Sequence, residues 1–274
     1  MKKIIQVALI IVLAVIIAGG AGFYIWAQAT YKPSEELFKL IGEENIRHEN
    51  DWIVFDPGAV KKAGIIIYPG AKVEPEAYSY LGGRLAENGY LVLVPEMRLN
   101  FSILEGNKAD ELIEHYPEIE RWYIGGHSLG GVSAATYAFN HADQIDGVIL
   151  LGSYPSSGSD FSDSTMPMLS IYAEKDGLTT PGKIEKTRHL LSDVADLYGI
   201  EGGNHAQFGM YGSQKGDNHA SIPPQRQQDL IVKEILRWLE ARSLTRIIIT
   251  VLNKKGPQWP LYLLLYLPKL FLEQ

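Results

Sequence analysis

The sequence predicts an α/β protein with a mostly parallel sheet that is covered by helices on both faces. Between residues 51 and 242, short apolar runs alternate with segments of helical pattern. Apolar runs without interspersed polar residues are typical of strands buried on both sides. The alternation of such strands with helices indicates a parallel sheet flanked by helices. A length of 274 residues allows one large domain of this kind.

The composition is that of a folded globular protein. Hydrophobic residues make up 46% and charged residues 21% of the chain, which excludes disordered and low-complexity classes. The chain has no cysteine, which excludes disulfides, thiolate metal sites and a cysteine nucleophile. Its net charge of −7 argues against nucleic acid as a partner, because nucleic acid favours a basic surface.

A long apolar segment near the start of the chain is expected to anchor the protein in a membrane. Residues 4–27 are apolar apart from one glutamine and three glycines, and as a helix they can cross a bilayer core of roughly 30 Å. Lys2 and Lys3 precede this segment, so the positive-inside rule places the body of the protein outside the cytoplasm. Tyr24 and Trp26 lie where an interfacial aromatic belt is expected.

A cleaved signal peptide is the alternative for residues 1–29. Ala27-Gln28-Ala29 has the form of an A-x-A cleavage site, and cleavage there would give a secreted protein. The apolar run is longer than the roughly 7–15 residues of most signal peptides, which favours a single-pass anchor. Residues 30–50 are then expected to form a linker.

The expected elements of the domain at residues 51–242 follow in chain order. We expect an edge strand at Asp51–Phe55 and further strands at Ala63–Tyr68, Tyr90–Val94, Arg121–Ile124, Gly147–Leu151, Met168–Ala173 and Asp196–Ile200. We expect helices at Pro75–Asn88, Ala109–His115, Leu129–Asn140, Ile184–Leu191 and Arg226–Ala241. Gly89 ends the first of these helices as a C′ glycine, and Pro95 ends the strand that follows it.

The last segment, residues 243–274, is an apolar and basic extension to which the sequence gives no role. Leu261–Leu267 is too short to span a bilayer, and Pro257, Pro260 and Pro268 interrupt any helix there. A position in a membrane interface and a disordered extension both fit this pattern.

The strongest local signal is Gly126-His127-Ser128-Leu129-Gly130. It matches G-x-S-x-G, in which a serine sits on a sharp turn between a strand and a helix with its hydroxyl above the sheet. Small residues are needed on both sides because the turn is strained and backbone passes close by. An apolar strand precedes the motif and a helix rich in small residues follows it, so we expect Ser128 to be a nucleophile.

A serine nucleophile needs a base to take its proton and an acid to orient that base. Asp176 follows the strand Met168–Ala173, and His205 follows the strand Asp196–Ile200 in a glycine-rich loop. Both therefore lie at the carboxyl edge of the sheet, where open α/β sheets bind ligands. Glu174 is the alternative acid and His219 the alternative base, but their positions in the chain fit less well.

The oxyanion of a tetrahedral intermediate needs backbone N–H donors. The residue after the nucleophile, Leu129, supplies one. The loop after Ala63–Tyr68 is expected to supply the second through Ala71, because Pro69 cannot donate and Gly70 allows the tight turn.

Together these motifs resemble the alpha/beta-hydrolase superfamily, and more closely its small, lidless, dienelactone-hydrolase-like branch (alpha/beta hydrolase fold-5). The resemblance rests on Tyr68-Pro69-Gly70, on the glycine-rich turn around Ser128, on the loop at Asp176 and on the stretch 202–209. It implies the α/β-hydrolase fold and a Ser128–Asp176–His205 triad. Dienelactone hydrolases proper use a cysteine nucleophile, so that specific activity does not carry over.

The expected function is serine-dependent hydrolysis of a small-molecule carboxylic ester, without a cofactor or metal. His205, Asp217 and His219 lack the spacing of a metal site. The longest segment that could cap the site, Tyr154–Thr165, is short, which favours an open pocket for small or medium acyl groups. A surface loop is the preferred interpretation of this segment, and a pocket lining by Ser156, Ser157 and Phe161 is the alternative. A non-catalytic binding protein on the same fold, a serine peptidase and an acyltransferase are the alternatives.

Overall fold

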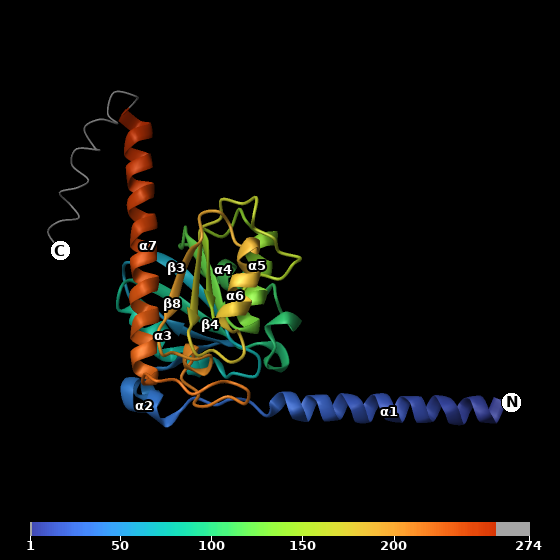
Figure 1. The fold of residues 1–274 in the computed structure, drawn as a ribbon. Coiled ribbons are helices and arrows are strands. Elements are labelled where there is room, and N and C mark those ends of the chain that lie inside the picture. Colours follow the sequence, from blue (N-terminus) through green and yellow to red (C-terminus); the bar gives the residue numbers. More distant parts are fainter. Residues whose placement is uncertain (1, 256–274) are drawn as a thin grey trace. The chain divides into compact units, whose positions relative to one another are not determined.

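A computed structural model describes residues 2–255, and its centre is one twisted sheet (Figure 1). In the described residues the sheet has eight strands in the order β1-β2-β4-β3-β5-β6-β7-β8. The strands are β1 (Arg47–Glu49), β2 (Trp52–Phe55), β3 (Ala63–Tyr68), β4 (Tyr90–Pro95), β5 (Trp122–His127), β6 (Gly147–Leu151), β7 (Met168–Ala173) and β8 (Asp196–Ile200). Strands β3 to β8 run parallel, so the mostly parallel sheet expected from the sequence is confirmed.

The antiparallel edge of the sheet differs from the sequence-based expectation. β2 pairs antiparallel with β4, and the short strand β1 pairs antiparallel with the other side of β2. β2 therefore is not the edge strand. β1 consists of Arg47, His48 and Glu49, and such a short polar strand carries no apolar signal. Short charged edges of this kind protect a sheet from pairing with other chains.

Helices cover the sheet on both faces. The helices of the described residues are α1 (Lys2–Gln28), α2 (Glu35–Ile41), α3 (Ser79–Ala86), α4 (Lys108–His115), α5 (Leu129–Asn140), α6 (Pro181–Thr187) and α7 (Pro224–Lys255). In Figure 1, α3 lies on one side of the sheet, and α4 and α5 lie on the other. A 3₁₀ turn at Pro75–Tyr78 forms the first part of the helix that was expected at Pro75–Asn88.

One large apolar core lies between the sheet and helices α4 and α5. Ile66, Leu91, Ile124 and Leu150 point from neighbouring strands into this core, which also holds the alanines of α5. Burying such aliphatic side chains stabilises the fold by about 1.5–3 kcal/mol each. Phe161 belongs to the same core and is not a pocket residue, because Tyr154–Thr165 packs on α5 rather than capping the sheet.

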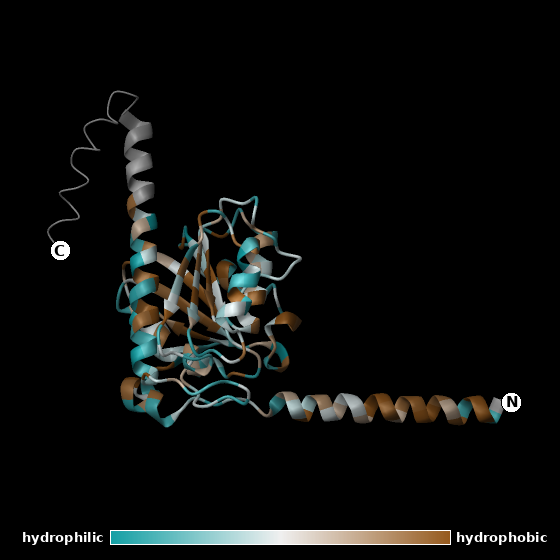
Figure 2. Ribbon diagram, viewed as in Figure 1, coloured by the Kyte–Doolittle hydropathy of each residue, from teal (hydrophilic) through white to brown (hydrophobic). Residues whose placement is uncertain are grey.

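The helix α1 is apolar along most of its length, as the colouring in Figure 2 shows. The most apolar 18-residue window within Lys3–Gln28 has a mean hydropathy of 2.8, and no part of this window is buried against the protein. This helix is long and apolar enough to cross a membrane, and a signal sequence would have the same properties.

Residues 30–50 are more structured than the linker expected from the sequence. Ser34 caps α2 by accepting a hydrogen bond from the N–H of Leu37. Leu37 is fully buried with Tyr80 and Met210 in a second, smaller core. A single buried leucine on a seven-residue helix gives too weak a periodicity to be found in the sequence.

Helix α7 is longer than the expected Arg226–Ala241. No glycine or proline occurs from residue 242 to residue 255, so nothing in the sequence ends the helix before Gly256. The chain divides within α7 into two compact units, Met1–Val232 and Lys233–Gln274. The apolar run Leu261–Leu267 lies outside the described residues.

Candidate active site

Ser128 occupies the turn between β5 and α5, which end at His127 and begin at Leu129. Its φ of 54° and ψ of −121° lie in a region that side chains rarely adopt, so the turn stores strain. Two hydrogen bonds hold it there. The N–H of Ser128 donates to the carbonyl of Leu151 over 3.0 Å, and its carbonyl accepts from Ser153 Oγ over 2.7 Å. The half-buried Ser128 is thus fixed by contacts with the neighbouring strand.

The glycines of the motif let backbone pass close to the turn. A Cβ atom on Gly130 would lie 2.2 Å from the carbonyl oxygen of Tyr68 and 2.4 Å from that of Pro69. A Cβ atom on Gly126 would lie 2.4 Å from the carbonyl carbon of Gly130. Both distances are impossible for real side chains, so α5 can start against the end of β3 only with glycine at these positions.

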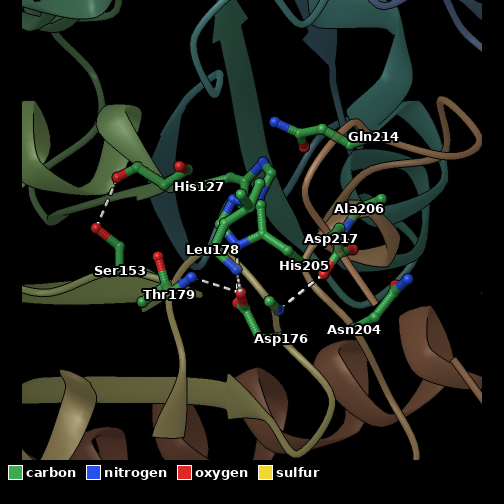
Figure 3. A network of polar contacts seen from close by, with 12 residues as sticks. His127, Ser153, Asp176, Leu178, Thr179, Asn204, His205, Ala206, Gln214 and Asp217 are labelled. Atoms are coloured by element: carbon green, nitrogen blue, oxygen red, sulfur yellow. Dashed lines mark hydrogen bonds and ion pairs between the residues drawn. The ribbon is translucent and has the colours of Figure 1, made fainter. Parts of the chain in front are cut away.

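Asp176 and His205 form a buried pair. His205 Nδ1 donates to Asp176 Oδ2 over 2.7 Å, and neither side chain is exposed to solvent. The other carboxylate oxygen accepts from the N–H groups of Leu178 and Thr179, at 2.8 and 2.5 Å (Figure 3). The second nitrogen of the ring, His205 Nε2, is buried and has no hydrogen-bond partner. A buried nitrogen without a partner is costly in a stable fold and is typical of functional sites.

The His205 ring lies next to the serine turn. Its centroid is 4.5 Å from that of His127, the residue before Ser128. Ser128 Oγ and His205 Nε2 are not joined by a hydrogen bond in this structure. Contacts of this kind are often long in ligand-free sites and shorten when substrate binds.

The side chain of His127 forms a hydrogen bond with Tyr78. Tyr78 Oη lies 2.9 Å from His127 Nδ1 and accepts a hydrogen bond of 2.8 Å from the N–H of Gly70. Burial, and then the proximity of His205, lower the pKa of His127 well below its ordinary value, while burial raises the pKa of Tyr78. His127 is therefore neutral near pH 7, and adds no repulsion to a proton on His205.

Asp217 joins the loops that carry Asp176 and His205. Its Oδ1 accepts from the N–H of Gly177 over 2.9 Å, and its Oδ2 accepts from the N–H of Ala206 over 2.8 Å. Sequence reasoning missed this role, because Asp217 lies in a loop without a recognisable motif. Its only local signal is a Gly-Asp-Asn turn.

The loop after β3 leaves one N–H group without an acceptor. Among the residues 69–72, the N–H of Gly70 donates to Tyr78 and that of Lys72 donates to the carbonyl of Asn100 over 2.8 Å. Pro69 has no N–H, so the N–H of Ala71 is the one backbone donor among residues 69–72 that has no acceptor in the structure. Leu129 is the first residue of α5, where N–H groups have no acceptor within the helix. Both donors expected from the sequence are thus unused by the fold.

The alternative residues have other contacts. Glu174 Oε2 accepts a hydrogen bond of 2.8 Å from the N–H of Gly202, which ties β7 to the loop after β8. His219 is exposed in the loop that contains Asp217. Among the residues that the structure describes, no group of three or more histidine or carboxylate side chains is arranged to hold a metal ion.

A model of the alpha/beta hydrolase family matches residues 64–229, which is more than half of the chain and contains the whole candidate site. The chain belongs to the alpha/beta hydrolase family. This confirms the resemblance seen in the motifs around Ser128 and His205. No curated protein matches the sequence of this family member.

Solved structures with the same fold are distant in sequence. An alpha/beta hydrolase enzyme, MGS-MChE2, from the metagenome of sediments from the lagoon of Mar Chica, Morocco, is 18% identical with a TM-score of 0.54. That match covers 72% of this chain and 99% of the other. Est1E from Butyrivibrio proteoclasticus is 14% identical with a TM-score of 0.54, covering 71% of this chain and 98% of its own. A structure described under the metagenome-derived lipolytic enzymes LipS and LipT is 14% identical with a TM-score of 0.54. That match covers 70% of this chain and 97% of the other. At these identities the likeness shows the fold alone.

Proposed function

We propose that the protein is a serine hydrolase that cleaves carboxylic esters through an acyl-enzyme. The observation that carries this proposal is the buried Asp176–His205 pair, in which Nε2 is free and the His205 ring lies against His127, the residue before the strained turn of Ser128. An unpartnered basic nitrogen next to a serine on such a turn is the arrangement that general-base activation requires. Membership of the alpha/beta hydrolase family and a fold shared with esterases and lipolytic enzymes agree with this chemistry.

In the proposed mechanism, His205 Nε2 takes the proton of the Ser128 hydroxyl while Oγ attacks the ester carbonyl carbon. The carbonyl oxygen becomes an oxyanion, and the N–H groups of Leu129 and Ala71 stabilise it. Asp176 keeps the proton of His205 on Nδ1 and stabilises the imidazolium that forms. The tetrahedral intermediate then breaks, and the departing alcohol takes the proton from His205. A water molecule, deprotonated by His205, hydrolyses the acyl-enzyme and restores Ser128.

We also propose that α1 remains attached as a membrane anchor, with the catalytic domain outside the cytoplasm. The basic residues before the helix support this orientation. The folded domain also makes contacts on the N-terminal side of the possible cleavage site. Ala27 is fully buried, and its carbonyl accepts a hydrogen bond of 3.1 Å from Asn100 Nδ2. Cleavage after Ala29 would remove these contacts.

The decisive test of the catalytic proposal is Ser128→Ala. We expect kcat for p-nitrophenyl butyrate to fall about 10³-fold or more, because the nucleophile is lost while the fold is kept. Ser157→Ala changes an exposed serine of the segment Tyr154–Thr165, which packs on α5 and does not cap the site, so this matched control should keep full activity. A fluorophosphonate probe should label the wild type and the control but not Ser128→Ala. Full activity of Ser128→Ala with an unchanged circular dichroism spectrum would contradict the proposal.

A further inference from the structure

The end of α1 contacts the edge of the sheet that carries the candidate active site. The ring of Phe101 stacks on Phe23 and Trp26, with centroids 6.2 and 5.6 Å away. The ammonium group of Lys72 lies 4.3 Å above the Trp26 ring. Lys72 directly follows Ala71, the proposed oxyanion donor. The candidate membrane helix is thus joined by aromatic and cation–π contacts to the loop beside the site.

A short rim segment, which we define as residues 98–104, connects the anchor to the serine turn. Asn100 donates to the carbonyl of Ala27 through its side chain, and its own carbonyl accepts from the N–H of Lys72. Ser102 Oγ donates to the carbonyl of Leu129 over 3.2 Å and lies 2.8 Å from Ser133 Oγ in α5. One segment therefore contacts both the membrane helix and the first turn of the helix that follows Ser128.

The rim segment ends in two exposed aliphatic side chains. Ile103 is 59% and Leu104 is 44% exposed. They are the only two consecutive residues among the exposed large apolar side chains that the structure describes outside α1. Together with Phe23, Tyr24, Trp26 and Phe101 they form what we call the interfacial patch. Exposed apolar side chains gathered in this way mark a contact surface, and aromatic residues at the end of a membrane helix favour the headgroup region.

We propose that the interfacial patch rests on the lipid bilayer and that the site takes its substrate from the membrane, as an amphiphilic ester. The inference rests on the proposed function, because it names the substrate class of the same Ser128. The bilayer is the occupant that fits, since the patch continues directly from a helix that is itself apolar enough to enter it. An ester that partitions into the membrane is concentrated at this surface, next to the site, whereas a freely soluble ester gains nothing from it.

Membrane contact can be tested by fluorescence, because the chain has no cysteine of its own. The full-length Ile103→Cys variant is labelled with a polarity-sensitive dye and reconstituted in phosphatidylcholine vesicles. We expect a blue shift and quenching by nitroxide-labelled lipid. Val194→Cys is the matched control. Val194 is 45% exposed, lies before β8 at the amino edge of the sheet, and should stay in water. Equal emission and equal quenching for both positions overturn the proposal.

The substrate class is tested with the double variant Ile103→Ser/Leu104→Ser in the same vesicles. We expect turnover of a long-chain fluorogenic ester carried in the bilayer to fall about fivefold or more, because apolar contact with the interface is lost. Turnover of soluble p-nitrophenyl butyrate should change by less than about twofold, since neither side chain contacts the reacting groups. Val60→Ser/Val194→Ser removes two exposed side chains near the amino edge and should leave both reactions unchanged.

Two failures can be told apart. A wild-type enzyme that hydrolyses butyrate through Ser128 but ignores the vesicle-borne ester, or an Ile103→Ser/Leu104→Ser variant with unchanged vesicle activity, overturns the membrane inference alone. A wild-type protein that cleaves neither ester, or whose activity survives in Ser128→Ala, overturns the proposed function and the inference with it.

Discussion

At the scale of single residues, the geometry of the candidate site depends on hydrogen bonds made by residues that do not themselves touch the reacting atoms. Asp217 is the clearest case, because each of its two carboxylate oxygens accepts an N–H from a different loop. One loop follows Asp176 and the other follows His205. We infer that this second carboxylate helps to set the length of the hydrogen bond between Asp176 and His205, as a positioning residue.

The variant Asp217→Asn tests this role. An amide can accept with only one of its two polar atoms, so one loop loses its contact and the Asp176–His205 geometry relaxes. We expect kcat to fall about tenfold to a hundredfold with KM within about twofold, because misplacement of reacting groups affects the chemical step. Steady-state kinetics on p-nitrophenyl butyrate measure both constants. Asp193→Asn, an exposed carboxylate elsewhere, should behave as wild type. An unchanged kcat in Asp217→Asn would show that the loops are held without it.

At the scale of elements, the serine turn is shaped by the close approach of α5 to the end of β3. The two carbonyl groups of Tyr68 and Pro69 occupy the space where a side chain on Gly130 would stand. The same approach brings the loop with Ala71 toward the first turn of α5. The packing of a helix against a strand end thus positions both proposed oxyanion donors relative to Ser128.

The variant Gly130→Ala should push the start of α5 away from the end of β3. Its Cβ cannot be accommodated without moving backbone, so we expect the free energy of unfolding to fall by about 3 kcal/mol, together with esterase activity. Gly83→Ala is the matched control, since Gly83 lies within α3 and its Cβ would meet nothing within 4 Å. It should raise stability by about 0.5–1 kcal/mol, because alanine favours helix more than glycine does. Urea unfolding of both variants gives the comparison, and a Gly130→Ala protein as stable as Gly83→Ala would contradict it.

At the scale of the whole molecule, the N-terminal helix contacts the domain only near its end. None of the most apolar window of α1 is buried, whereas its last residues and the segment after it are bound to the domain. Tyr31 forms a β-bridge with Val73, and Thr30 Oγ1 donates to Glu74 over 2.6 Å. The chain therefore enters the domain directly from the helix, beside the candidate site, without a free spacer.

We expect the full chain, expressed in a bacterial host, to stay in the membrane fraction after an alkaline carbonate wash. A helix of about 25 apolar residues is long enough to remain in the bilayer. The mass of the purified protein should include residues 1–28, and protease added to spheroplasts should digest the catalytic domain. A soluble product that begins at Thr30 would instead establish cleavage after Ala29.

Much of the fold was predictable because its signals are local. Five strands or helices of the domain, among them Ala63–Tyr68 and Leu129–Asn140, have the bounds that the sequence suggested. Each is bounded by a turn or consists of one uninterrupted apolar run. The strand β1, the helix α2 and the extension of α7 were not found. Their residues carry weak periodicity or no stop signal, and their formation depends on distant partners or on the absence of a breaker.

The sequence by itself determined most of the strands and helices of the domain, the family and the position of the serine turn. These features follow from apolar runs and from glycines whose small size is required locally. Only the tertiary structure decided which polar groups meet. The contact between Asp176 and His205, the two loops joined by Asp217, and the attachment of α1 to residues 98–104 all link segments far apart in the chain. Such contacts depend on how the strands align and the loops pack, which local patterns do not specify.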